Sequence, residues 1–191
     1  DWYQDTNVIS ILHILCQNNK HQNMISLTPY VKDTNVTYMF PVFSPIMHAT
    51  LDKTILCIGY CKNESISKNT IRFFHSMSEY QFIYITWGDS SYRNLENIKN
   101  VRRIDRGMSA IDMTTLIAKC SFILSKNPIN YDRFCGQLSM AVSYEKPLII
   151  DKKTADSYGL PGIVFNKDYT EALSSFPMND NVYKEHVSKI R

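Results

Sequence analysis

The residues of this sequence that could do chemistry gather in four polar segments, each of which follows a short apolar run. The segments are 59–68, 88–91, 125–136 and 151–162. In an open parallel sheet, ligands bind at the carboxyl ends of the strands, beside helix N-termini whose free N–H groups attract anions. The sequence therefore predicts that a ligand contacts these four segments.

Several common catalytic motifs are absent from the sequence. The first segment holds only Gly59 where the dinucleotide-binding fingerprint has three glycines, and no P-loop pattern occurs, which weighs against an NAD enzyme and a nucleoside triphosphatase. Cys57 and Cys61 lie four positions apart, but no second pair completes a zinc site, so we expect no bound metal. A cysteine nucleophile is unsupported as well, because no recognisable motif ties a cysteine to a histidine or an aspartate.

Strands and helices must alternate through most of the chain in order to position these segments. Apolar runs predict strands at 54–60, 81–87, 101–104, 121–125, 147–151 and 162–165. Helical periodicity and capping residues predict helices at 67–77, 109–119, 136–144, 168–176 and 181–190. Such alternation implies right-handed crossovers in a mostly parallel sheet. The predicted fold class is therefore α/β, a Rossmann-like, mostly parallel sheet with helices on both faces.

The first 53 residues do not continue this alternation. We expect an amphipathic helix at 7–17, a strand at 24–27 and an extended linker or edge at 38–45. The predicted organisation is an N-terminal extension or remnant of a preceding domain at 1–53, followed by a Rossmann-like domain at 54–191.

Composition and charge restrict the class of protein. Of the 191 residues, 44% are hydrophobic and 20% charged, which is typical of a globular domain. The net charge is only +3 and the basic residues are scattered, so we expect no nucleic-acid partner. The longest apolar runs are too short to span a membrane, no signal-peptide pattern follows Asp1, and the five cysteines lack framework spacing. These features predict a cytoplasmic protein with reduced thiols. The abundance of Asn, Ile, Lys, Ser and Tyr suggests an A/T-biased genome, such as that of a parasite or a large virus.

Residues 117–151 carry the most distinctive pattern in the chain. They read IAKCSFILSKNPINYDRFCGQLSMAVSYEKPLIID: a strand leads into a loop with Phe134 and Gly136, a helix follows, and Lys146-Pro147 opens the next strand. This order resembles the nucleotide-sugar-binding half of the GT-B glycosyltransferases, which has a Glu-Gly-Phe-Gly-like loop, a helix with Glu-Ala-Met, and Gly-Lys-Pro-Val-Ile. Residues 55–68, 83–88 and 100–124 resemble other segments of that family in the same order, so that the resemblance covers 54–176.

The resemblance implies roles for individual residues. Lys68 is implied as a cation that faces the donor diphosphate, and Asp132 as the acidic group that touches the sugar. The family's phosphate-binding Arg falls on Tyr60, or on Cys61 one residue further on, and Arg133 is a candidate to replace it. Met140 stands where the family has the Glu that holds the ribose hydroxyls. The other residues implied to contact the substrate are Gly59, Gly88, Phe134, Cys135 and Gly136.

The function implied by the resemblance is that of a glycosyltransferase. The domain at 54–191 would bind a nucleotide-sugar as its donor substrate, without a cofactor, and transfer the sugar to an unknown acceptor. An acceptor-binding half needs roughly another 150 residues, so we expect a separate acceptor-binding domain or a homo-oligomer. Because Met140 and Tyr60 replace two donor-binding residues, the alternative is a degenerate, non-catalytic binding or assembly module. A different small-molecule enzyme on a flavodoxin-like sheet is a third hypothesis.

Overall fold

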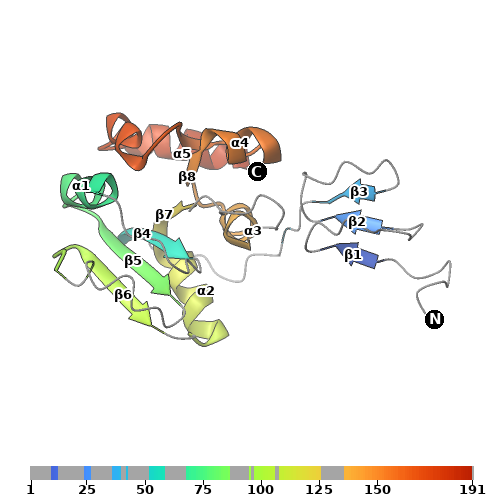
Figure 1. Cartoon of the computed structure of the whole chain (residues 1–191), viewed down its shortest axis with the longest axis horizontal. Helices are drawn as coiled ribbons and strands as arrows, with labels where there is room; N and C mark the ends of the chain where they lie inside the picture. Colours follow the sequence, from blue (N-terminus) through green and yellow to red (C-terminus); the bar gives the residue numbers. More distant parts are fainter. Residues whose placement is uncertain are drawn as a thin grey trace.

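In the part of the chain that the computed structural model describes, the strands form two parallel β-sheets (Figure 1). It describes residues 10–12, 24–26, 36–39, 42, 52–58, 68–86, 95, 97–105, 108–125 and 136–190. Expectations that fall on other positions lie outside the described residues.

The larger sheet has six parallel strands, which correspond to the six strands predicted from the apolar runs. They are β4 (Asp52–Ile58), β5 (Gln81–Thr86), β6 (Val101–Asp105), β7 (Cys120–Leu124), β8 (Leu148–Asp151) and β9 (Gly162–Phe165). Their spatial order is β6-β5-β4-β7-β8-β9. Counted from β4, this is the 3-2-1-4-5-6 order of doubly wound Rossmann folds. The predicted Rossmann-like α/β fold is therefore confirmed.

Helices cover both faces of this sheet. Alternate residues of a strand point to opposite faces, so that Ile55 and Cys57 of β4 belong to one hydrophobic core and Leu56 to the other. The first core also takes side chains from α1 (Lys68–Ser76), the 3-10 helix η3 (Tyr169–Ser175) and α5 (Asp180–Ile190). The second core takes side chains from α2 (Ala110–Lys119), α3 (Gly136–Ser143) and α4 (Lys152–Tyr158).

The first core is rich in aromatic side chains. Phe73 and Phe74 of α1 are fully buried, and the ring of Phe74 lies 4.5 Å from that of Phe82, centroid to centroid. The ring of Tyr183 in α5 packs edge-on against Phe122 of β7 at 5.5 Å. Its hydroxyl donates a 3.0 Å hydrogen bond to the carbonyl of Ser121. Ring packing and this bond together fix α5 against β7.

Two helix ends are closed by side chains. The backbone N–H of Asp112 donates to Oγ of Ser109 at 3.1 Å, which confirms the predicted N-cap of α2. At the end of α1, the side-chain amide of Asn100 donates to the carbonyls of Phe74, Met77 and Tyr80 at 2.8, 3.1 and 3.1 Å. Carbonyl groups left over at a helix C-terminus need such partners.

The predicted loop at 151–162 was wrong, because it contains α4. This helix has no apolar periodicity, and capping residues define its two ends. Asp151 is the N-cap, and Gly159 ends the helix in the left-handed conformation with φ of 65°. The predicted helix at 168–176 is likewise a 3-10 helix, η3, instead of an α-helix.

The smaller sheet contradicts the helix predicted at 7–17. Its strands are β1 (Ser10–Leu12), β2 (Met24–Ser26) and β3 (Val36–Tyr38), all parallel and in that order. A short apolar run such as the one in β1 is compatible with a helix or a strand. In this structure its pairing with β2 stabilises the strand. β2 confirms the strand predicted at 24–27. The predicted linker at 38–45 is described only at residues 38, 39 and 42, all of which are exposed. The boundary predicted at residue 53 stays a prediction.

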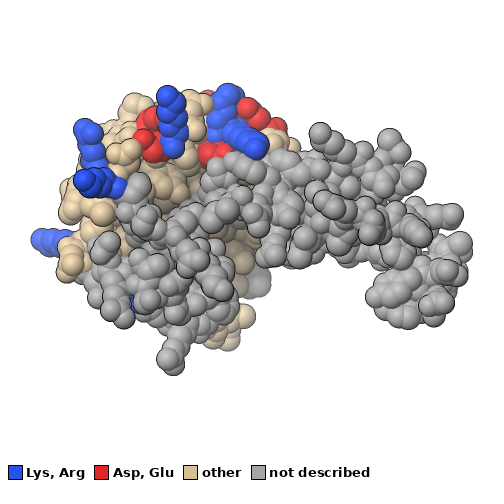
Figure 2. Space-filling view, in the orientation of Figure 1, with Lys and Arg blue, Asp and Glu red and all other residues tan. Residues whose placement is uncertain are grey.

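The charges on the visible face are mixed in sign. Figure 2 shows basic and acidic side chains next to one another over α4 and α5, where Lys152 pairs with Asp156 and Lys189 with Glu185. No helix within the described ranges is both long enough and apolar enough to cross a bilayer.

Candidate functional site

The strand order places the topological switch point of the larger sheet at the carboxyl ends of β4 and β7. These two strands are neighbours, but the chain continues from β4 toward β5 and from β7 toward β8, in opposite directions across the sheet. At such a switch point the connections diverge and leave room for a ligand. The predicted site residues that follow β4, β5 and β7, which are Gly59, Tyr60, Gly88, Asp132, Arg133, Phe134 and Cys135, lie outside the described residues.

Three predicted site residues are described. Lys68 is the exposed first residue of α1, and Gly136 is the exposed first residue of α3. Both helices begin at the carboxyl end of the sheet, but on opposite faces of it, so the structure brings the two residues to the same end without placing them on one face. A Cβ atom on Gly136 would meet no atom within 4 Å, so the space beside it is open. Met140, one turn further along α3, is half-buried against the second core.

Four buried polar side chains lie at the same end, and we name them the oxygen cluster. Ser125 directly follows β7 and Asp151 ends β8, whereas Gln137 and Thr154 lie in the first turns of α3 and α4. Their exposed fractions are 0% for Ser125, 8% for Gln137, 4% for Asp151 and 1% for Thr154. Each has one buried oxygen without a hydrogen-bond partner: Ser125 Oγ, Gln137 Oε1, Asp151 Oδ2 and Thr154 Oγ1.

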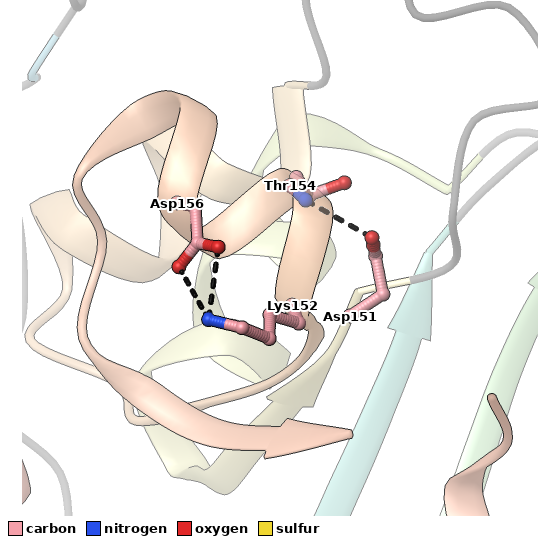
Figure 3. Close-up of polar contacts among 4 residues, drawn as sticks. All are labelled: Asp151, Lys152, Thr154 and Asp156. Carbon is pink, nitrogen blue, oxygen red and sulfur yellow. Dashed lines mark hydrogen bonds and ion pairs between the residues drawn. The ribbon is translucent and has the colours of Figure 1, made fainter. Parts of the chain in front are cut away.

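The backbone holds these side chains in place. The N–H of Ser125 donates to the carbonyl of Ile149 at 2.9 Å, which fixes the end of β7 beside β8. Oδ1 of Asp151 accepts a 3.0 Å hydrogen bond from the N–H of Thr154, so that one carboxylate oxygen caps α4 (Figure 3). The other oxygen, Oδ2, has no hydrogen-bond partner among the described residues. Figure 3 also shows Lys152 turned toward Asp156, with which it forms a 2.9 Å ion pair at the surface.

Unpaired buried oxygens are unusual, because most buried polar atoms in proteins have a partner. Leaving one without a partner costs about 1–3 kcal/mol. A carboxylate and an amide oxygen accept hydrogen bonds, and the two hydroxyls both donate and accept. Each of these four side chains therefore keeps the capacity for one further hydrogen bond.

Sequence reasoning located the segments of the oxygen cluster but missed its residues. Segments 125–136 and 151–162 were predicted to contact a ligand, whereas no individual role was assigned to Ser125, Gln137, Asp151 or Thr154. A signal was present at two of them, because Ser125 and Asp151 are polar residues that end otherwise apolar strand runs. Gln137 and Thr154 gave no such signal, since their burial results from tertiary packing.

Lys146 and Cys120 lie at the opposite, amino end of the sheet. Burial raises the pKa of the Cys120 thiol to about 12, although the positive charge of the nearby Lys146 lowers it in part. The thiol is therefore protonated at neutral pH. Both side chains, Cys120 and the Cys57 of β4, are buried, and Cys120 is a free thiol.

Comparison with known proteins rests on the fold. No protein family and no curated protein matches the sequence. Among solved structures, AviGT4, a glycosyltransferase involved in avilamycin A biosynthesis, aligns with a TM-score of 0.55 and 14% identity over 87% of this chain and 60% of its own. This chain has the fold of a GT-B half. The lipopolysaccharide outer core galactosyltransferase WaaB aligns with a TM-score of 0.49 and 13% identity over 89% of this chain and 58% of its own. The GT-B-like chain thus spans about 60% of the length of AviGT4.

Proposed function

We propose that this chain binds a nucleotide-sugar at the carboxyl ends of β4 and β7 and transfers the sugar to an acceptor. The observation that carries the proposal is the switch point between these strands, at which α1 and α3 begin. The likeness to AviGT4 supports it, since that protein is a glycosyltransferase with this fold.

The proposed chemistry needs a cation near the departing diphosphate. As the bond between the sugar's anomeric carbon and the diphosphate oxygen breaks, negative charge grows on the diphosphate, and a new bond forms to the acceptor oxygen. Lys68 is exposed at the start of α1 and is proposed to stabilise that charge. The N–H groups at the start of α3 are proposed to face the phosphates, and the open space beside Gly136 lets the backbone approach them.

The predicted roles outside the described residues remain part of the proposal. Asp132 is proposed to contact the sugar and Arg133 to add a second cation. The donor is a substrate, and the proposed transfer needs no further cofactor. Since the chain spans only about 60% of the length of AviGT4, the acceptor is proposed to bind to a separate domain or a second copy. The free, buried thiol of Cys120 supports the cytoplasm as the proposed compartment.

Calorimetric titration with UDP-, GDP- and ADP-sugars tests this function. We expect one nucleotide series to bind, and Lys68→Ala to weaken its binding at least tenfold. The control is Lys189→Ala, which removes an exposed lysine paired with Glu185 on α5, and it should leave binding unchanged. If none of these ligands binds the wild-type protein at millimolar concentration, the proposal is wrong.

The second candidate function is that of a non-catalytic binding or assembly module. Met140 favours it, because this half-buried side chain packs against the second core where the family has a ribose-binding Glu, and a thioether cannot bind two hydroxyls as a carboxylate does. A protein that binds the nucleotide but releases no diphosphate from the nucleotide-sugar, and that forms a stable dimer by light scattering, would favour this function.

A further inference from the structure

A hollow lies at the amino end of the larger sheet, away from the candidate site, and we name it the amino-end hollow. It is bounded by the end of α1 and by residues near the starts of β4, β5 and β6, and its volume is about 520 Å³. Most of its described lining residues are exposed: Lys53, His75, Ser78, Glu79, Gln81 and Lys99. Sites for small molecules measure about 300–1,000 Å³, so the hollow is large enough for a whole small molecule.

Two more deeply buried residues, Tyr80 and Asn100, complete the lining and are held in place. Tyr80 is 7% exposed, and its ring packs against the ring of Phe122 in the first core, at 5.9 Å between centroids. Asn100 is half-buried, and its side-chain amide donates to three carbonyls at the end of α1. This part of the hollow is therefore formed before any ligand arrives, which lowers the entropic cost of binding.

The charges around the hollow favour an anion. Nζ of Lys53 and Oε2 of Glu79 form a 3.3 Å ion pair, in which the two charges balance. The side chains of Lys99 and His75 have no hydrogen bond or ion pair with any described residue. Lys99 is therefore left as an uncompensated positive charge, and the His75 ring can donate a further hydrogen bond.

A metal ion fits the hollow poorly. The carbonyl end of a helix attracts cations, but the Asn100 amide already donates to three carbonyls at the end of α1. Glu79 is the single carboxylate among the described lining residues, and no group of three metal-ligating side chains occurs in the part of the chain that the structure describes.

The uncharged groups of the lining add a second requirement. The Ser78 hydroxyl and the Gln81 amide both donate and accept hydrogen bonds, and the Glu79 carboxylate accepts them. An inorganic anion would use only the donors and would fill a small part of the volume. A molecule that carries hydroxyl groups beside its anionic group would use the acceptors as well.

We propose that the amino-end hollow binds a phosphate monoester of a small, hydroxylated molecule. Lys99 and His75 hold the phosphate, and Ser78, Glu79 and Gln81 bind the hydroxyl groups. This is a second ligand site, at the end of the sheet opposite the proposed donor site, and it does not rest on the proposed function.

NMR titration of the wild-type protein tests this site, with ribose 5-phosphate, inorganic phosphate and ribose as probes. Ribose 5-phosphate should bind at least fivefold more tightly than either of the other two. The amide signals of residues 78–81, 99 and 100 should shift, and those of residues 136–140 should not. Shifts confined to the start of α3, or equal affinities for ribose 5-phosphate and inorganic phosphate, would overturn the inference.

Two substitutions at the hollow should act in opposite directions. Lys99→Ala should lower the affinity for ribose 5-phosphate at least fivefold, because it removes the uncompensated charge. Glu79→Gln should raise the affinity for inorganic phosphate at least twofold, because Lys53 loses the carboxylate that balances it. A general loss of folding cannot produce both results.

Each substitution has a matched control outside the hollow. Lys119→Ala removes another exposed lysine, at the end of α2, and Asp156→Asn removes another exposed carboxylate that is paired with a lysine. Both should leave the affinities for the probes unchanged. Equal effects of the controls and of the substitutions at the hollow would mean that net charge governs binding, which would overturn the inference.

Nucleotide-sugar titration of Lys99→Ala separates this inference from the proposed function. The variant should bind the nucleotide-sugar as the wild-type protein does. If it weakens both ligands equally, the hollow is not a separate site and the inference is overturned. If no nucleotide-sugar binds the wild-type protein but ribose 5-phosphate shifts the signals at the hollow, the proposed function fails and the inference stands.

Discussion

The Nζ atom of Lys146 lies 2.7 Å from the carbonyl oxygen of Ala118, so that the residue before Pro147 is bonded to the last turn of α2. Lys146 is 6% exposed, and burial lowers the pKa of its ammonium, although Cys120 and Glu145 nearby raise it. A cation at a helix C-terminus also interacts favourably with the carbonyl groups exposed there. This residue of the Lys-Pro pair therefore has a structural role at the end of the sheet opposite the candidate site.

Replacement of Lys146 by methionine should destabilise the protein. The side chain keeps its length, but the carbonyl of Ala118 loses its donor in a buried place, so the free energy of unfolding should fall by about 1–3 kcal/mol. Urea denaturation measures the change. Lys152→Met is the control: that lysine is exposed and its ion pair lies at the surface, so a change below about 0.5 kcal/mol is expected. Equal effects of the two substitutions would contradict the role of the buried bond.

Glu145 is expected to be a position where glycine improves stability. Its φ is +52°, in the left-handed region, and it occupies the position of the glycine that precedes Lys-Pro in the family it resembles. The left-handed conformation costs a non-glycine residue about 1–2 kcal/mol, which glycine would not lose. Glycine's greater conformational freedom in the unfolded chain offsets about 0.5–1 kcal/mol of that gain in stability. Glu145→Gly should therefore raise the free energy of unfolding by about 0.5–1 kcal/mol. Glu145→Ala retains the strained φ and should bring no such gain, so equal stability of the two variants would argue against backbone strain.

Two glycines should respond in opposite ways to replacement by alanine. A Cβ on Gly162 would lie 2.7 Å from the carbonyl oxygen of Leu148, because β8 and β9 approach closely there, and Gly162→Ala should destabilise the fold by about 1–3 kcal/mol. Gly136 has open space around it, so Gly136→Ala should leave the Tm of the free protein unchanged or raise it. Under the proposed function the added methyl group also lowers nucleotide-sugar affinity. A large loss of Tm in Gly136→Ala would contradict the open space.

Two carboxylates near η3 should make stability depend on pH. Hydrogen bonds from the side chain and backbone of Thr170 hold the pKa of Asp168 below its usual range, and the N–H groups of Asn166 and Lys167 do the same for Glu171. A pKa that is lower in the folded state stabilises the fold above the ordinary carboxyl pKa of about 4, and this contribution is lost as the pH falls through the lowered value.

The double variant Asp168→Asn, Glu171→Gln tests this dependence. Wild-type protein should be the more stable at pH 7, and the difference should shrink toward zero as the pH approaches 3. Urea denaturation across that range measures it, with Asp156→Asn as a control for loss of an exposed carboxylate. A difference between wild type and double variant that stays constant with pH would contradict the prediction.

The larger sheet could be predicted from the sequence because its strands are buried on both faces, and such strands consist of continuous apolar runs. Short runs rich in β-branched and aromatic residues, such as the one around Ile55 and the one around Phe82, are typical of strands that are buried on both faces. Ser109 and Asp112 marked the start of α2 through their own side chains, which is information carried by neighbouring residues.

What could not be predicted depends on groups distant in sequence. β1 is a strand because it pairs with β2, and the apolar run at Ile11 does not contain that information. α4 lacks an apolar stripe, and its two end signals, Asp151 and Gly159, were interpreted as a loop. The burial of Gln137 and Thr154 follows from packing between helix starts and strand ends, which no local pattern records.

The three hydrogen bonds of Asn100 affect where the chain can be cut to make a fragment or a chimaera. Asn100, which comes after β5, donates to the carbonyls of Phe74, Met77 and Tyr80. These bonds add to the backbone bonds that Phe74 and Met77 accept from the N–H groups of Met77 and Tyr80. A fragment or chimaera with its junction before position 100 would lose these three side-chain hydrogen bonds, and the end of α1 should become less stable. Junctions for domain grafting therefore belong beyond Asn100.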